Sequence, residues 1–213
     1  MSTAGGTSTA ARSHRTKLWR QRLFEAESGL TRFFVEENAP ELLDEWIRVK
    51  AGIFEDLPNG DIESDWQRAF FRAQALMERF LVAHFGHDRM ADWATSNAYV
   101  YAATTTDSTC AQSVADRFVR QLANYDSETE VTADLSAASI SVKKCGIWQY
   151  RERARARGVP ITLASPCEYC TKATAANFSA KGYASTYELT SEPSRGCRWT
   201  LRTGSEVATA EQP

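Results

Sequence analysis

The spacing of apolar side chains changes once along the chain, near Tyr125, and this change constrains the fold more than any other feature. Before it, apolar residues recur every three or four positions, which is typical of amphipathic helices. After it, Ala138, Ile140 and Val142 alternate with polar residues, as in a half-buried strand. Helices followed by strands predict an α+β fold, with an N-terminal helical layer and then a small antiparallel sheet with a crossing helix.

Five helices are predicted upstream of Tyr125, and the longest carries one continuous apolar stripe from Trp66 to His84. The first is expected to end near Gly29, and the state of residues 30–37 stays open between helix and strand. The five predicted ranges are 17–27, 41–54, 63–85, 88–103 and 110–125.

After Tyr125, the spacing of apolar residues indicates short strands, one basic helix and a hairpin. A turn or short helix is expected to begin at Cys167, after Pro166. The basic helix carries four arginines, for which we expect a solvated outer face, with an anionic partner as the alternative. The predicted strands cover 131–135, 138–142, 183–189 and 197–201, and the helix covers 147–157.

Length and composition indicate one globular domain over residues 17–204, between disordered tails at 1–16 and 205–213. The net charge of −2 argues against a nucleic-acid partner. No window reaches the roughly 20 apolar residues of a membrane span, so no membrane partner is expected. The first residues lack the apolar core of a signal peptide and the cysteine count of 5 is odd, so we expect a cytoplasmic protein with reduced thiols.

Four of the five cysteines lie in the last third of the chain, and they are the main candidates for chemistry. A nucleophilic cysteine needs a lowered pKa and partial exposure, which the start of a helix at Cys167 can supply. Glu168 or Asn177 can orient a partner or a water beside it. Cysteines are also common as small buried apolar residues, and we favour that framework role for Cys145 and Cys197.

The sequence also contains candidates for a metal site and for an amine-binding site. The pair Cys167 and Cys170 has the spacing of a zinc clamp that Cys145 and Cys197 can complete. A second close pair is absent from the sequence, so we expect no metal and no cofactor, and keep zinc as an alternative. Glu188 lies on the opposite face of its strand from Tyr187, where it either binds an amine or is a solvated edge residue.

Several segments between Trp66 and Arg202 form a pattern. They are Phe85-Gly86-His87-Asp88-Arg89-Met90-Ala91-Asp92-Trp93-Ala94, Val142-Lys143-Lys144-Cys145, the helix to Gly158-Val159-Pro160, Cys167, and Gly196-Cys197-Arg198-Trp199-Thr200-Leu201. Together these segments resemble a known family, the L-2-amino-thiazoline-4-carboxylic acid hydrolases and their relatives. The C-terminal part is also similar in outline to the small-molecule-binding domain named after vinyl reductases.

The resemblance implies an enzyme that opens a C–N bond of a small cyclic, amino-acid-like substrate, in a setting such as bacterial specialised metabolism and antibiotic biosynthesis. One departure is that Cys170 stands where the family commonly has an acidic residue. A non-catalytic module for a small molecule or zinc, and a subunit of a ring-forming homo- or hetero-oligomer, stay open. The expected catalytic residues are Cys167, Glu168, Cys170 and Asn177, and the expected substrate contacts are Cys145, Tyr169 and Glu188.

Overall fold

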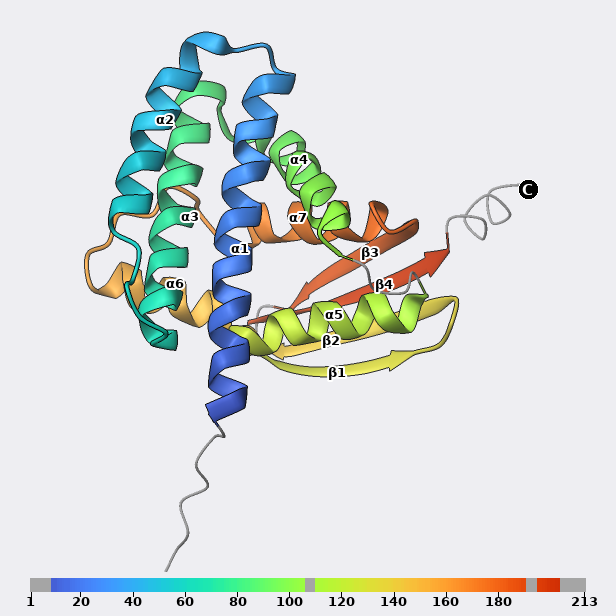
Figure 1. Ribbon diagram of the computed structural model, residues 1–213. Helices are drawn as coiled ribbons and strands as arrows, with labels where there is room; N and C mark the ends of the chain where they lie inside the picture. Colours follow the sequence, from blue (N-terminus) through green and yellow to red (C-terminus); the bar gives the residue numbers. More distant parts are fainter. Residues whose placement is uncertain (1–8, 106–109, 191–194, 204–213) are drawn as a thin grey trace, which may run out of the picture.

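The computed structural model describes residues 9–105, 110–190 and 195–203, and it confirms the α+β fold (Figure 1). Helices come first in the chain, and a four-stranded antiparallel sheet is built from its second half. The elements are α1 (Thr9–Glu36), α2 (Pro40–Glu55), α3 (Glu63–Phe85), η1 (His87–Arg89), α4 (Met90–Ala103), α5 (Ala111–Asn124), β1 (Glu128–Ala133), β2 (Ala137–Lys144), α6 (Gly146–Ala156), α7 (Cys167–Ser179), β3 (Tyr183–Thr190) and β4 (Gly196–Thr203).

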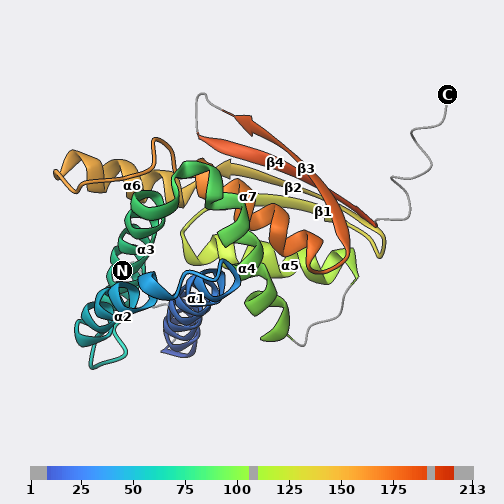
Figure 2. The ribbon, with the colours of Figure 1, turned by 90° about the horizontal axis from the view of Figure 1, so that it is seen from above.

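The buried apolar side chains form two clusters. The helical core joins α1, α2, α3 and the start of α4, and it contains the fully buried Trp19, Trp46 and Trp93. The sheet core lies between one face of the sheet and the helices α5 and α7 (Figure 2). Each cluster removes many large side chains from water, and this burial is the main favourable term in folding.

The sheet has the strand order β1-β2-β4-β3, and its register places the predicted apolar positions on one face. Trp199 of β4 pairs with Ile140 on one side and with Tyr187 on the other. Its ring also packs edge-on against Phe178 of α7, with centroids 5.5 Å apart. The alternation read from the sequence therefore identified the buried face of β2 and β4 correctly.

The N-terminal helix differs from the prediction. α1 is one helix that begins at Thr9 and passes through Gly29, so residues 9–16 are helical rather than a tail and residues 30–36 continue the helix. At Gly29 a side chain would collide with Asn97 of α4, because a Cβ built there lies 1.6 Å from Asn97 Oδ1. The glycine thus permits the close approach of α1 and α4 instead of ending a helix. Residues 1–8 and the predicted tail 205–213 lie outside the described ranges.

A buried ion pair connects the two halves of the molecule. Arg151 of α6 donates to Glu78 of α3, which is 1% exposed, and Gln74 Nε2 donates to the same carboxylate at 3.1 Å. Beside this pair, Tyr150 stacks on Phe71 with ring centroids 3.6 Å apart. The expected solvated face of the basic helix is therefore wrong for Arg151, whereas Arg155 is exposed and pairs with Glu152 on its own helix.

None of the described helices combines the length and the apolar composition that a membrane crossing requires.

We predict that Arg151→Met lowers the free energy of unfolding by about 3 kcal/mol, because it leaves the buried Glu78 carboxylate without its cation. Urea unfolding followed by tryptophan fluorescence measures the change. Arg155→Met is the matched control and is expected to cost less than about 1 kcal/mol, since its ion pair is exposed. Equal losses in the two variants would contradict a structural role for the buried pair.

Candidate functional site

A cavity of about 340 Å³ lies between the sheet and the helices α5, α6 and α7, and four cysteines line it. We call it the thiol cavity. Cys145 precedes α6, Cys167 and Cys170 lie in the first turn of α7, and Cys197 is in β4. The convergence of these residues, which the sequence suggested from their positions at the ends of elements, is confirmed.

Two close backbone contacts set the wall around Cys145. Gly146 lies against the carbonyl of Tyr125, where a built Cβ would be 1.6 Å from the oxygen, and Gly196 lies similarly against the carbonyl of Val142 at 2.1 Å. The amide of Cys145 donates to the carbonyl of Arg195 at 2.9 Å. The Cys145 Sγ in turn accepts from the Trp148 amide at 3.4 Å and caps α6.

The second wall is α7, a helix of 13 residues where the sequence predicted a turn or a short helix. Ser165 Oγ accepts from the Cys167 amide at 3.1 Å, and Thr171 Oγ1 donates to the Cys167 carbonyl at 2.7 Å. Cys167 is the first residue of this helix, so its side chain lies at the positive end of the helix dipole.

Burial keeps three of the thiols protonated at neutral pH. It raises the pKa of Cys170 to about 12, and the neighbouring thiols add to the increase. Burial likewise raises the pKa of Cys197 to about 12, and it raises the pKa of Cys145. A thiol is a weak nucleophile and a weak metal ligand until it loses its proton, so these three side chains behave mainly as small apolar groups.

The rest of the described lining is mostly apolar, and the polar exceptions are few. Arg195 is exposed at the edge of the cavity, with its guanidinium 4.5 Å from the ring centre of Trp148. Among the lining residues that the structure describes there is no histidine, aspartate or glutamate. The apolar lining consists of Phe118, Leu122, Val142, Ile147, Trp148, Pro166, Leu189 and Trp199.

The helical phase of α7 separates the residues proposed from sequence. Because each residue turns a helix by 100°, Cys167 and Cys170 share one face whereas Glu168 and Tyr169 point elsewhere. Glu168 Oε1 is hydrogen-bonded to His87 Nδ1 of η1. Tyr169 stacks on Trp93 at 4.2 Å and is hydrogen-bonded to Asn97 in the helical core.

The last two predicted residues also lie away from the thiol cavity. Asn177 lies seven residues after Cys170 on the same face of α7, and it lines a neighbouring cavity of about 60 Å³ that shares Ile147, Pro166 and Cys170 with the thiol cavity. Glu188 is exposed and stands opposite Arg198 on the neighbouring strand. Its neighbour Tyr187 packs on Trp199 instead, so Glu188 points to the outer face of the sheet. Of the seven proposed residues, only Cys145, Cys167 and Cys170 line the cavity.

Several lining residues were not predicted as parts of a site. Phe118 and Leu122 are buried on one face of α5, but nothing local in the sequence relates them to cysteines at positions 145 to 197. Arg195 and Trp148 meet through the antiparallel pairing of β2 with β4, which sequence spacing alone does not reveal.

Metal binding at this cavity is not supported by the geometry of the described residues. Within residues 9–105, 110–190 and 195–203, no three cysteine, histidine or acidic side chains are close enough to share a metal ion. The thiols line a common wall without forming a four-sulfur cluster.

Comparison with models of known families, with curated proteins and with solved structures gave no match. The resemblance to thiazoline-carboxylate hydrolases therefore stays a prediction.

We predict that stability falls in alkali because of these thiols. Unfolded cysteine loses its proton near pH 9, whereas folded Cys170 and Cys197 keep theirs until about pH 12. The folded state binds more protons in this window, so the contribution is complete below pH 9 and is lost as the pH rises. Urea unfolding between about pH 9 and pH 11 should show that the free energy of unfolding falls with pH, by up to about 1.4 kcal/mol per pH unit for each thiol.

Cys170→Ala is the comparison that isolates this effect, since tyrosines also ionise in the same range. The variant loses one buried thiol, so its stability should decline less steeply with pH than that of the unchanged protein. Parallel slopes for the two proteins would show that Cys170 does not contribute.

Proposed function

We propose that the thiol cavity binds a small, largely apolar molecule that carries one anionic group. The observation that carries this proposal is the cavity itself, at about 340 Å³ and with a lining of aromatic, aliphatic and thiol side chains. Ligand pockets have volumes of about 300–1,000 Å³ and combine an apolar lining with a few polar anchors. The raised pKa values of Cys145, Cys170 and Cys197 support an uncharged interior.

Arg195 is the proposed anchor for the anionic group. Its guanidinium is always charged, and its planar fork binds a carboxylate through two parallel hydrogen bonds. The contact with Trp148 orients this fork at the edge of the cavity. A ligand with its apolar part among Leu122, Val142 and Trp199 would therefore extend its anionic group toward Arg195.

Hydrolysis of a C–N bond in a cyclic amidine is the second candidate. One observation favours it: Cys167 is half-buried at the cavity and is the first residue of α7, where the helix dipole stabilises a thiolate. Such a reaction also needs a general base, and the described lining holds no histidine or carboxylate beside Cys167. Binding without chemistry is for this reason the better-supported function.

The proposed compartment is the cytoplasm. Cys145, Cys167, Cys170 and Cys197 surround one cavity, and no disulfide joins any of them. Neighbouring thiols persist in this form where glutathione and thioredoxin keep them reduced.

The first experiment tests binding with cinnamate, an apolar ring with one carboxylate, and with its uncharged analogue cinnamyl alcohol. Both should bind saturably and quench the fluorescence of Trp148 and Trp199, which line the cavity. Arg195→Gln should lower the affinity for cinnamate about tenfold and leave the affinity for cinnamyl alcohol unchanged, because it removes only the charge-assisted hydrogen bonds.

A matched pair of leucines controls for unspecific effects. Leu189 is 55% exposed and lines the cavity, whereas Leu135 is 78% exposed and lies outside it. Leu189→Trp should obstruct the cavity and weaken both ligands by at least about tenfold, and Leu135→Trp should leave both affinities as they were. Equal affinities in the two tryptophan variants, or no saturable binding at all, would contradict the proposal.

The second experiment tests hydrolysis directly. The protein is incubated with 2-amino-thiazoline-4-carboxylate, and ring opening is followed by chromatography. If the protein turns this compound over, Cys167→Ala should lower the rate by at least about 1,000-fold, as expected when a nucleophile is removed. Cys110→Ala is the matched control because Cys110 lies outside the cavity and should leave the rate unchanged. A rate that Cys167→Ala does not alter would exclude Cys167 as the nucleophile.

A further inference from the structure

A second pocket, of about 350 Å³, lies between α1, α4 and α5 and shares no lining residue with the thiol cavity. Three arginines line it, and the described lining holds a single carboxylate, that of Glu25. We call this the arginine pocket.

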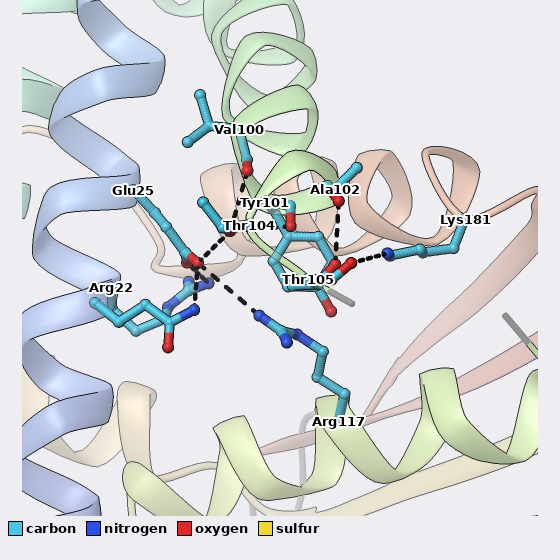
Figure 3. Close-up of polar contacts among 10 residues, drawn as sticks. Arg22, Glu25, Val100, Tyr101, Ala102, Thr104, Thr105, Arg117 and Lys181 are labelled. Atoms are coloured by element: carbon cyan, nitrogen blue, oxygen red, sulfur yellow. Dashed lines mark hydrogen bonds and ion pairs between the residues drawn. The ribbon is translucent and has the colours of Figure 1, made fainter. Parts of the chain in front are cut away.

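Glu25 organises the cationic side of the arginine pocket, as Figure 3 shows. It is buried, and its Oε1 accepts hydrogen bonds from Gln21 Nε2 at 2.8 Å and Thr104 Oγ1 at 3.1 Å. The guanidinium of Arg22 lies 3.7 Å from this carboxylate and that of Arg117 lies 3.9 Å from it. One carboxylate thus holds two arginines from different helices side by side.

Tyr101 of α4 supports the same group of side chains. The guanidinium of Arg117 lies 4.4 Å from the centre of its ring. Burial raises the pKa of the Tyr101 hydroxyl, although Arg117 opposes the increase, so the hydroxyl keeps its proton and can act as a donor. Arg120 is exposed and lines the same pocket, which places a third guanidinium toward solvent.

Asn124 provides an independent sign that a ligand belongs in this pocket. It is the last residue of α5, is 3% exposed and lines the pocket. Neither its Oδ1 nor its Nδ2 has a hydrogen-bond partner within the described part of the protein. A buried amide without partners is destabilising, and native structures contain few of them. A polar ligand in the pocket would satisfy the amide.

We infer that the arginine pocket binds a small oxyanion with more than one negative charge, either a phosphorylated compound or a polycarboxylate. Planar guanidinium groups bind phosphate and carboxylate oxygens through paired, charge-assisted hydrogen bonds. In this arrangement Arg22 and Arg117 bind the anion inside the pocket, Arg120 attracts it from solvent, and Asn124 Nδ2 donates to one of its oxygens. This site is independent of the function proposed for the thiol cavity.

The experiment titrates the full-length protein with pyrophosphate and, separately, with citrate at constant ionic strength, using isothermal calorimetry. At least one anion should bind saturably with one site per chain. Binding of pyrophosphate but not of citrate would identify a phosphate site. Binding of citrate but not of pyrophosphate would identify a polycarboxylate site. Failure of both to saturate would overturn the inference.

Three variants distinguish the pocket from general surface charge. Arg117→Gln should weaken the bound anion at least about tenfold, whereas Arg153→Gln, which removes an exposed arginine of α6 outside the pocket, should leave the affinity unchanged. Equal weakening by these two variants would overturn the inference.

Asn124→Leu keeps the measurement decisive if Arg117→Gln fails to fold. Leucine has a similar volume and no unpartnered polar atoms, so this variant should bind the anion more weakly and unfold at a temperature equal to or higher than that of the unchanged protein. If Asn124→Leu binds the anion with unchanged affinity, the Asn124 amide does not contact the anion, and the proposed arrangement is contradicted.

Discussion

The contact between Gly146 and the carbonyl of Tyr125 is the constraint on which the arrangement of the two cores depends. The Tyr125 ring belongs to the helical core, where it packs edge-on against Trp19 with centroids 5.0 Å apart. Its carbonyl touches the residue that follows Cys145, where β2 gives way to α6. Only glycine permits this approach, and Ser127 Oγ secures it by accepting from the Gly146 amide at 3.0 Å. The position of Cys145 is thereby tied to the helical core and to the sheet at once.

From that junction, α6 extends away from the sheet and is held by the Glu78–Arg151 pair and by Tyr150 on Phe71. These contacts orient the start of α6, which carries Ile147 and Trp148 into the wall of the thiol cavity. The cavity is thus formed where the end of β2 and the first turns of α6 and α7 meet the sides of α5 and β4.

The fold could be predicted from the sequence because its signals are local. The change of period near Tyr125 separates helices from strands, and the alternation in β2 and β4 identifies the buried face. The predicted end of the first helix near Gly29 is wrong. Glycine can end a helix or permit two helices to pack closely, and the sequence does not distinguish these two roles. The site was predicted in part. Cysteines at the ends of elements converge, but the exclusion of Glu168 and Tyr169 depends on the phase of α7, and that of Asn177 depends on its position further along the same helix.

The arginine pocket could not have been found from sequence, since Glu25 meets Thr104 and Arg117 across separations of about 80 and 90 residues. Its relation to the thiol cavity follows from helix geometry. On α5, Phe118 and Leu122 line the thiol cavity, whereas Arg117 and Gln121, each one residue earlier, line the arginine pocket. A step of one residue turns the helix by 100°, so one helix forms a wall of both sites. Because packed helices move as rigid bodies, a ligand that displaced α5 in one site would also change the other, and without such a displacement the two sites would bind their ligands independently.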